Sequence, residues 1–437
     1  MENEVKEVEE VEEKSSHHHH SHHHHHHHHK SSKKKRFSLR RFMQKHKTPI
    51  RIVTLLVVLV LVIAATVFTV KQLDAGSQGG TPTVDPPAPT TPQIPEGHVA
   101  VTVTRFDVPA VLNHDIVTTY LNTNLSIEPI EVLREYYQVL RLDQGQPVEL
   151  AYDVLGLAEG CNITGFRVEV TEKGQKEPVF RKDYGAGESS VVLYNLKTAS
   201  TYQYTVRADF NAMDSITVSG EFETAAGPRL LKVDGIANVR DFGGWKVGNT
   251  YIKQGLLYRG TELDGVIEDE FTIKNDGIKT MTELFGIRTE MDLRETETRP
   301  DRNMLGNEVN YPAPYNVPLY EAVFERSGQI AMCRIFQDLA NPENYPIYTH
   351  CTYGRDRTGT VCLVLGAVLG MEEDDLIREY GLSALYYGNV DYADAYKVLD
   401  GMKAFGGETL REQTENYLLS IGLTADEIAS LRQIYLG

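Results

Sequence analysis

The sequence predicts a multidomain protein with a single transmembrane helix, a β-sandwich and a C-terminal α/β domain whose central sheet is flanked by helices. Three observations support this prediction. An uncharged apolar run occupies 52–70, alternating strand patterns fill the chain up to residue 226, and strand and helix patterns then alternate to the end. The length of 437 residues also exceeds that of one typical domain.

Residues 1–49 form a low-complexity tail. A histidine tract, His17–His20 and His22–His29, is followed by a basic stretch from Lys30 to Arg51. This composition predicts a disordered tail rather than a dedicated metal site. The first 71 residues carry 13 Lys and Arg against 7 Asp and Glu. Since the formal net charge of the whole chain is −17, the rest of the chain is strongly acidic. Because general nucleic-acid binders are usually basic, no nucleic-acid partner is expected.

Residues 50–71 form the predicted transmembrane helix. Every residue from 52 to 70 is apolar, Ala or Thr, and a helix of this length, rising about 1.5 Å per residue, roughly matches the hydrocarbon core of a bilayer. A cleaved signal peptide fits less well, because the tail before the run is very long. Since the basic cluster precedes the run, the N-terminus is expected in the cytoplasm and the C-terminal domain outside the cell. The expected location is therefore the cell membrane, with a single pass.

Residues 72–97 are rich in Gly, Pro and Thr, which predicts an extended linker. The strand patterns of 98–226, such as GFRVEVTE and YQYTVRADF, are separated by turn residues and predict a β-sandwich. The part 98–146 fits this pattern poorly, because it contains the candidate helix IEVLREYYQVL. The sequence leaves open whether this part completes the sandwich or forms a separate element.

The stretch VVLYNLKTASTYQYTVRA resembles the later strands of a fibronectin type III domain. In that family a Leu before the turn and a Tyr of the next strand pack together in the core. Leu196 and either Tyr202 or Tyr204 occupy these positions here. The resemblance implies a spacer or docking module, and the sequence does not indicate its partner.

The domain 227–437 contains one loop with the residues of an anion site. YPIYTHC predicts a strand, and TGTVCLVLGAVLGM predicts a helix beginning at Thr358, with a loop between them. A helix N-terminus offers unpaired N–H groups and the positive end of the helix dipole. Gly354 allows the backbone to turn, and Arg357 can donate two hydrogen bonds to a phosphoryl group.

Cys351 begins this loop. A free thiol is only about 3 % thiolate at pH 7, so a nucleophilic cysteine needs stabilisation of its thiolate. Loop N–H groups, the helix dipole, Arg357 and the Thr358 hydroxyl can supply it. The four scattered cysteines contain no Cys-x-x-Cys motif, which argues against zinc and against a disulfide framework.

The loop HCTYGRDRTG resembles the phosphate-binding loop of cysteine-dependent protein tyrosine phosphatases. Further motifs are similar to those of an atypical bacterial branch with an Asn-x-Arg-Asp-x-Gly-Gly signature, some members of which also act on phosphoserine, phosphothreonine or phosphoinositides. The branch usually has Lys at the position of Arg355. In chain order the matching motifs are GIANVRDFGG, LLYRGTEL, GIRTEMDLRETET and YLLSIGLTADEIASLRQIYL.

The resemblance implies a tyrosine phosphatase that works through a phosphocysteine and needs no metal or other cofactor. Its expected substrate is a phosphorylated protein or a phosphoinositide. Cys351 is the implied nucleophile, Arg357 binds the phosphoryl oxygens, and Asp356 protonates the leaving oxygen. The other loop residues expected to bind phosphate are Thr352, Tyr353, Gly354, Arg355 and Thr358.

Other residues have roles that the sequence leaves open. Asp292, at a predicted strand end, is the alternative general acid, or it forms a structural ion pair with Arg294. Arg240 and Asp241 either organise the site from outside or form a salt bridge that stabilises a turn. His350 is expected to hydrogen-bond the loop backbone. The alternative function is a catalytically silent phosphoanion-binding or adhesion protein that works through its β domain.

Overall fold

The computed structural model describes residues 98–123, 130–139 and 141–437. The predicted tail, transmembrane helix and linker, residues 1–97, lie outside the described residues. Within the part that is described, no helix is both long and apolar enough to cross a membrane.

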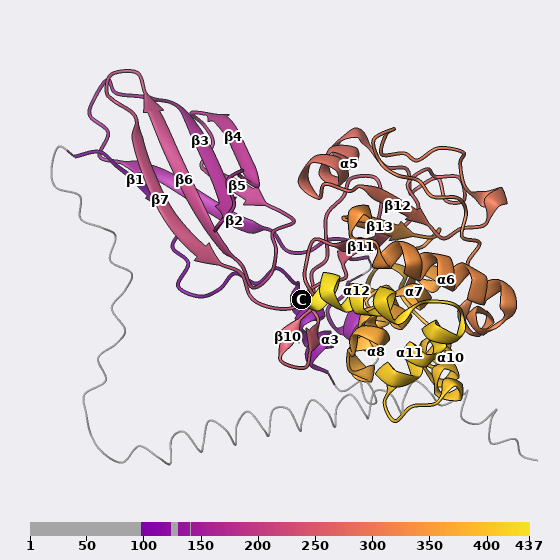
Figure 1. Cartoon of the computed structure of the whole chain (residues 1–437). Coiled ribbons are helices and arrows are strands. Elements are labelled where there is room, and N and C mark those ends of the chain that lie inside the picture. Colours follow the sequence, from indigo (N-terminus) through magenta and orange to yellow (C-terminus); the bar gives the residue numbers. More distant parts are fainter. Residues whose placement is uncertain (1–97, 124–129, 140) are drawn as a thin grey trace, which may run out of the picture. The chain divides into compact units, whose positions relative to one another are not determined.

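Two antiparallel sheets form the β domain (Figure 1). The first has the strand order β1-β2-β5 and the second β4-β3-β6-β7. Alternate residues point to opposite faces of a strand, so each sheet has one apolar face, and these faces share a single core. The arrangement is a β-sandwich. Its strands are β1 (Ala100–Val103), β2 (Val148–Leu155), β3 (Ile163–Glu172), β4 (Phe180–Gly185), β5 (Ser190–Leu193), β6 (Thr201–Phe210) and β7 (Ile216–Glu223).

Leu196 and Tyr202 are both buried in the core of the sandwich. The Tyr202 hydroxyl also accepts a hydrogen bond from the backbone N–H of Lys197 at 2.7 Å. This contact fixes the turn before β6. The fibronectin type III assignment itself stays a prediction.

A four-stranded mixed sheet with the order β12-β13-β11-β8 lies at the centre of the C-terminal domain. β13 is parallel to β12 and β11, so the carboxyl ends of these three strands meet at one edge. Open α/β sheets bind their ligands at this edge. The strands are β8 (Arg240–Asp241), β11 (Leu257–Gly260), β12 (Thr289–Asp292) and β13 (Ile347–His350), and a separate pair is β9 (Lys246–Val247) and β10 (Thr250–Tyr251).

Helices cover this sheet, and α7 is the central one, in contact with α8, α10, α11 and α12 (Figure 1). α7 is buried from Thr358 to Leu369, as its apolar sequence requires. Capping boxes begin α11 and α12. The predicted α/β architecture of the C-terminal domain is confirmed. The helices are α3 (Asp115–Asn122), α4 (Ile130–Tyr136), α5 (Asn275–Lys279), α6 (Arg326–Ala340), α7 (Asp356–Leu369), α8 (Glu373–Gly381), α9 (Ala384–Tyr387), α10 (Tyr392–Met402), α11 (Leu410–Ser420) and α12 (Ala425–Leu436), with the short turns η1 (Thr280–Leu284), η2 (Thr296–Thr298), η3 (Tyr320–Phe324), η4 (Pro342–Asn344) and η5 (Lys403–Phe405).

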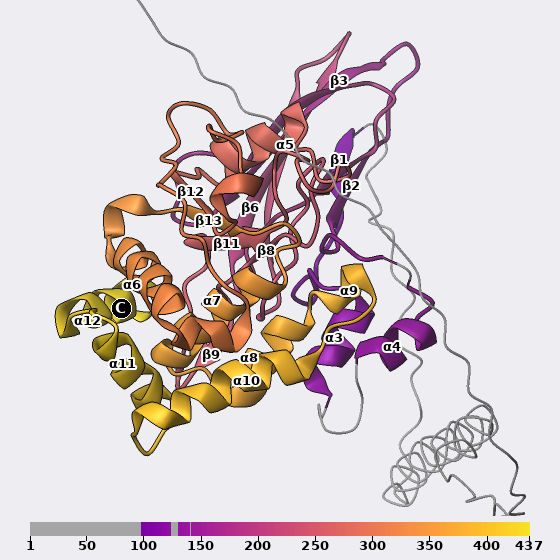
Figure 2. The same cartoon turned by 90° about the vertical axis from the view of Figure 1, so that its right-hand side faces the viewer.

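The region 98–146, whose place the sequence left open, is divided between the two cores. β1 completes the first sheet by pairing with β2. α3 and α4 instead bury Ile116, Tyr120 and Ile130 in the core of the C-terminal domain. Figure 2 shows these two helices close to α9. The physical reason is that an amphipathic helix needs an apolar face to cover, and the strands of the sandwich already fill their own core.

Buried polar groups connect the β domain to the C-terminal domain. Arg229 is 3 % exposed, pairs with Asp241 at 2.7 Å and donates to the carbonyl of Asn195 at 2.7 Å. The Gln254 amide exchanges two hydrogen bonds of 2.9 Å with the backbone of Thr198. Residues 92–437 accordingly form one compact unit.

Replacing Arg229 by Met is expected to lower the free energy of unfolding by about 3–5 kcal/mol, because Asp241 then stays buried without its charged partner. Urea denaturation of residues 92–437 measures the change. Arg167→Met is the matched control, because Arg167 forms a similar pair with Asp183, at 2.6 Å, on the exposed surface. Equal losses in the two variants would contradict the importance of the buried pair.

Candidate active site

The loop between β13 and α7 carries the Cys-x5-Arg sequence. α7 begins at Asp356, two residues earlier than predicted, so Asp356 and the residue after it belong to the first helical turn. Gly354 has a φ of +62°, and a Cβ there would lie 2.1 Å from the Gly260 carbonyl oxygen. Only glycine fits at this position, which brings the loop against the end of β11. Cys351, the first residue of the loop, is 2 % exposed.

Arg357 and Thr358, in the first turn of α7, each bury a polar side-chain atom. Within the described residues, neither Arg357 Nη1 nor Thr358 Oγ1 forms a hydrogen bond. An unsatisfied buried polar group costs on the order of 1–3 kcal/mol and is rare in folded proteins. Both atoms lie at a helix N-terminus, where free N–H groups favour negative charge. The arrangement fits an anion whose oxygens would complete these hydrogen bonds.

Three buried charged side chains support the loop. Glu379 of α8 accepts hydrogen bonds from Arg240 Nε at 2.8 Å and from Arg259 Nη1 at 2.5 Å. Arg259 then donates from Nη2 to the Gly354 carbonyl at 2.6 Å. Burial opposes the charged form of Glu379, but the two arginines outweigh it and hold the pKa of Glu379 below its usual value. Arg240 therefore organises the loop through Glu379.

Asn238 connects the early signature to the same loop. Its Nδ2 donates to the carbonyl of Tyr353 at 3.1 Å, and its Oδ1 accepts from Arg240 at 2.7 Å. Asp241, which follows Arg240 in the signature, instead accepts a hydrogen bond from Arg229. It also accepts hydrogen bonds from the backbone N–H groups of Gly243 and Gly255, both at 2.8 Å. Asp241 thus forms the salt bridge that stabilises a turn, which was one of its two predicted roles.

Sequence reasoning missed Arg259, Glu379 and Asn238 as supports of the loop. For Arg259, the sequence does contain a signal. LLYRG reads as a buried strand that carries an arginine, and a buried arginine requires a buried acid nearby. Nothing in the sequence indicates which of the many acids that partner is.

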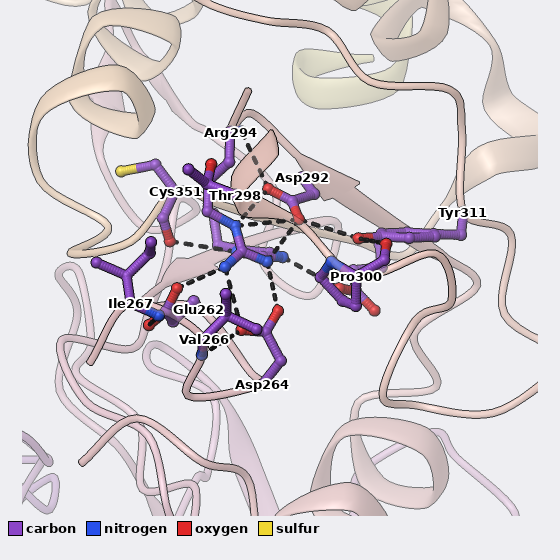
Figure 3. A network of polar contacts seen from close by, with 12 residues as sticks. Glu262, Asp264, Val266, Ile267, Asp292, Arg294, Thr298, Pro300, Tyr311 and Cys351 are labelled. Carbon is purple, nitrogen blue, oxygen red and sulfur yellow. Dashed lines mark hydrogen bonds and ion pairs between the residues drawn. The ribbon is translucent and has the colours of Figure 1, made fainter. Parts of the chain in front are cut away.

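Arg294 lies among three buried carboxylates, from Glu262, Asp264 and Asp292 (Figure 3). Figure 3 also shows that the sulfur of Cys351 points away from this cluster. Burial disfavours the Asp292 carboxylate, but the charge of His350 and the hydrogen bonds of Arg294 outweigh it and hold the pKa of Asp292 far below its usual value. An ionised carboxylate is a poor proton donor, so the geometry favours the structural ion pair over the acid role.

His350 contacts the loop backbone and a buried acid. Its Nδ1 is 3.2 Å from the Cys351 carbonyl oxygen, and its Nε2 is 3.1 Å from Glu290 Oε1. Burial opposes protonation of the ring, but Asp292 and Glu290 outweigh it and raise the pKa of His350. A charged ring donates both hydrogen bonds and thereby fixes the start of the loop.

Glu290, Asp292 and His350 also bring their possible metal-ligand atoms within 4.8 Å of one another. The group is already neutralised, however, because Arg294 binds Asp292 and His350 binds Glu290. A cation there would face the positive charge of Arg294. The donor set therefore does not fit a metal site.

Arg355 and Tyr320 hold the carboxylate of Asp356. Arg355 donates to it from Nε at 2.9 Å and from Nη2 at 3.2 Å, and the Tyr320 hydroxyl donates at 2.5 Å. The Arg355 guanidinium also lies 5.7 Å from the ring centre of Tyr353 and 5.4 Å from that of Tyr387. Two aromatic rings and a cation thus lie together beside the loop.

Of the predicted phosphate-binding residues, Thr352 is buried and its carbonyl accepts from the Glu262 N–H at 3.0 Å. Tyr353 is half-buried, and its hydroxyl donates to Glu268. The carbonyl of Tyr353 also accepts from Tyr387 at 2.6 Å. These contacts, two of them through backbone carbonyls, brace the loop, and the unsatisfied atoms beside it are those of Arg357 and Thr358 among the described residues.

Glu379→Gln is expected to lower the free energy of unfolding by about 3–5 kcal/mol, because Arg240 and Arg259 stay buried without a carboxylate. Urea denaturation is the measurement. Asp375→Asn, on the same helix, is the matched control: Asp375 pairs with Arg378 at 2.8 Å but is 26 % exposed, so its loss should stay below about 1 kcal/mol. A Glu379→Gln variant as stable as this control would contradict the supporting role of Glu379.

Part of the chain is similar to known proteins. No curated protein matches the chain. Among solved structures, the chain is similar to the core catalytic domain of the PP-IP phosphatase SIW14 from S. cerevisiae, in complex with citrate, at 16 % identity and a TM-score of 0.24, over 34 % of this chain and 82 % of that one. Residues 231–437, which include the whole loop and the Glu379 and Arg294 networks, match the model of the tyrosine phosphatase family.

Proposed function

We propose that this protein is a membrane-anchored, cysteine-dependent phosphatase that hydrolyses phosphotyrosine monoesters through a phosphocysteine intermediate. The family match of residues 231–437 supports a cysteine-based phosphatase. The observation that carries the proposal is the pair of buried atoms, Arg357 Nη1 and Thr358 Oγ1, that have no partner among the described residues. Both residues lie in the first turn of α7, directly after the loop that begins at Cys351, where a phosphoryl group would supply the missing acceptors.

In the first step, the Cys351 thiolate attacks phosphorus. The S–P bond forms as the bond from phosphorus to the leaving oxygen breaks, and the electron pair stays on that oxygen. Asp356 gives its proton to the leaving oxygen. Arg357 and the N–H groups of the loop stabilise the negative charge on the three equatorial oxygens.

In the second step, water attacks the phosphocysteine. Asp356, now a carboxylate, takes a proton from this water as the new O–P bond forms. The S–P bond breaks and returns its electron pair to Cys351. The products are inorganic phosphate and the starting thiolate.

Phosphotyrosine is the preferred substrate class in this proposal, because aromatic side chains lie next to the loop. Tyr353 and Tyr387 pack edge to face with ring centres 5.6 Å apart, and Arg355 lies near both rings. The phenyl ring of a substrate makes more favourable contacts with aromatic rings and a guanidinium than an alkyl chain does. Phosphoserine, phosphothreonine and phosphoinositides are the other substrate classes. Comparing the kcat/KM for each of them with the kcat/KM for a phosphotyrosine peptide decides among the classes.

Cys351→Ser is expected to abolish hydrolysis of an aryl phosphate, because a serine hydroxyl is far less nucleophilic than a thiolate. Release of phosphate by residues 92–437 measures this, and vanadate should inhibit the unchanged protein. Cys161→Ser is the matched control, since Cys161 is a free cysteine of the β domain. Ordinary turnover by Cys351→Ser would disprove the mechanism. Absence of turnover in the unchanged protein, with phosphopeptide binding retained, would favour a catalytically silent phosphoanion-binding protein.

The membrane anchor is part of the proposal. It is supported by the uncharged run 52–70 and the basic residues before it. Protease added to intact cells is expected to remove 227–437, because the proposed orientation displays this domain outside. An antibody against the C-terminus measures the loss, and lysed cells give the reference for complete digestion. Protection in intact cells with digestion after lysis would overturn the orientation and leave the catalytic proposal untouched.

A further inference from the structure

We propose that Tyr320 is a positioning residue for the general acid: its hydroxyl holds Asp356 so that Oδ2 is the atom that carries the transferred proton. The inference rests on the proposed phosphatase function. It adds a residue that lies outside the Cys-x5-Arg loop, 36 positions before Asp356 in the chain.

The two oxygens of the Asp356 carboxylate have different surroundings. Oδ1 accepts the Tyr320 hydroxyl at 2.5 Å and Arg355 Nε at 2.9 Å. Oδ2 accepts one longer hydrogen bond, from Arg355 Nη2 at 3.2 Å, among the described residues. A proton on Oδ1 would lie against the hydrogens of two donors that already point at this oxygen. The acid proton therefore belongs on Oδ2.

The backbone holds Tyr320 in an unusual conformation. Its φ is +47°, a left-handed value that an aromatic residue rarely adopts. Such strain persists where the surrounding structure determines it, and it is concentrated at functional sites. Here the Tyr417 hydroxyl donates to the Val323 carbonyl at 2.9 Å and fixes η3, the turn that Tyr320 begins.

One further contact involves the ring of Tyr320. Lys397 Nζ lies 5.9 Å from the centre of this ring. Burial and the hydrogen bond to Asp356 raise the pKa of Tyr320, so its hydroxyl keeps its proton at neutral pH. Tyr320 is thus a constant donor to Oδ1.

The chemistry assigns separate tasks to the two residues. When the bond from phosphorus to the leaving oxygen breaks, that oxygen keeps the electron pair and receives the proton from Oδ2. In the next step, Oδ2 of Asp356 takes a proton from the attacking water. Tyr320 gives up no proton in either step and only keeps Oδ1 occupied. Loss of the Tyr320 hydroxyl should therefore lower kcat most for the substrates whose leaving oxygen most needs a proton.

The test compares Tyr320→Phe with the unchanged protein on two substrates, using residues 92–437. Phenyl phosphate has a poor leaving group that needs a proton, whereas 2,4-dinitrophenyl phosphate has a good one that does not. The kcat for phenyl phosphate is expected to fall about tenfold or more, and that for 2,4-dinitrophenyl phosphate less than about twofold. KM should stay the same for both. Equal losses of kcat on the two substrates would overturn the inference.

Tyr417→Phe is the matched control. It removes a hydroxyl that holds the same turn, through Val323, and leaves Asp356 untouched. Its losses on the two substrates should be equal, and its melting temperature shows the effect of loosening η3 alone. A strong leaving-group dependence in this control would also overturn the inference, because it would make the effect structural.

A double variant separates positioning from a general disturbance. Asp356→Asn with Tyr320→Phe should be no slower on phenyl phosphate than Asp356→Asn alone, because Tyr320 acts only through Asp356. Additive losses would contradict this. If the unchanged protein turns over neither substrate, the proposed phosphatase function fails. An active protein with equal losses disproves only the role of Tyr320.

Discussion

The geometry of the candidate site depends on the two ion pairs of Glu379. This carboxylate joins Arg240 of β8 to Arg259 of β11, and Arg259 holds the Gly354 carbonyl of the loop at 2.6 Å. All three charged side chains are at most 2 % exposed, so none of them can find water if a partner is lost. Breaking such a pair is costly, which makes the position of the loop hard to change.

The distribution of arginine partners explains how an acidic protein can bind an anion. Arg229, Arg240, Arg259 and Arg294 are each neutralised by buried carboxylates. Arg357 has no ion-pair partner among the described residues, and its Nη1 is buried and unsatisfied. Local hydrogen-bond donors at a helix N-terminus thus act against the negative net charge of the chain, which is −17 in total.

The segment that leads out of the β domain also helps to build the site. The Leu142 N–H donates to the Leu385 carbonyl of α9 at 3.0 Å, and Arg141 donates to the Tyr386 hydroxyl at 3.1 Å. The next residue of α9, Tyr387, donates to the Tyr353 carbonyl of the loop at 2.6 Å. The segment between β1 and β2 therefore braces the loop through α9.

Several features could be predicted from the sequence because they depend on local chemistry. The strand, loop and helix around Cys351, the need for glycine at 354, and the alternating strands of the sandwich follow from residue types and their spacing over a few positions. The start of α7 was predicted two residues late, because Asp356 is a poor helix former by propensity but is favoured in the first turn, where its charge complements the helix dipole. The pairing of Asp292 with Arg294 was one of two roles left open.

The sequence by itself determined which residues form the loop, because a strand end, a glycine and a helix N-terminus are local signals. Only the tertiary structure decided which distant side chains support it: Glu379 under Arg240 and Arg259, α3 and α4 against the C-terminal core, and Tyr320 on Asp356. These contacts join residues that are far apart in the chain. A buried charge must find some partner, but only the fold determines which one it meets.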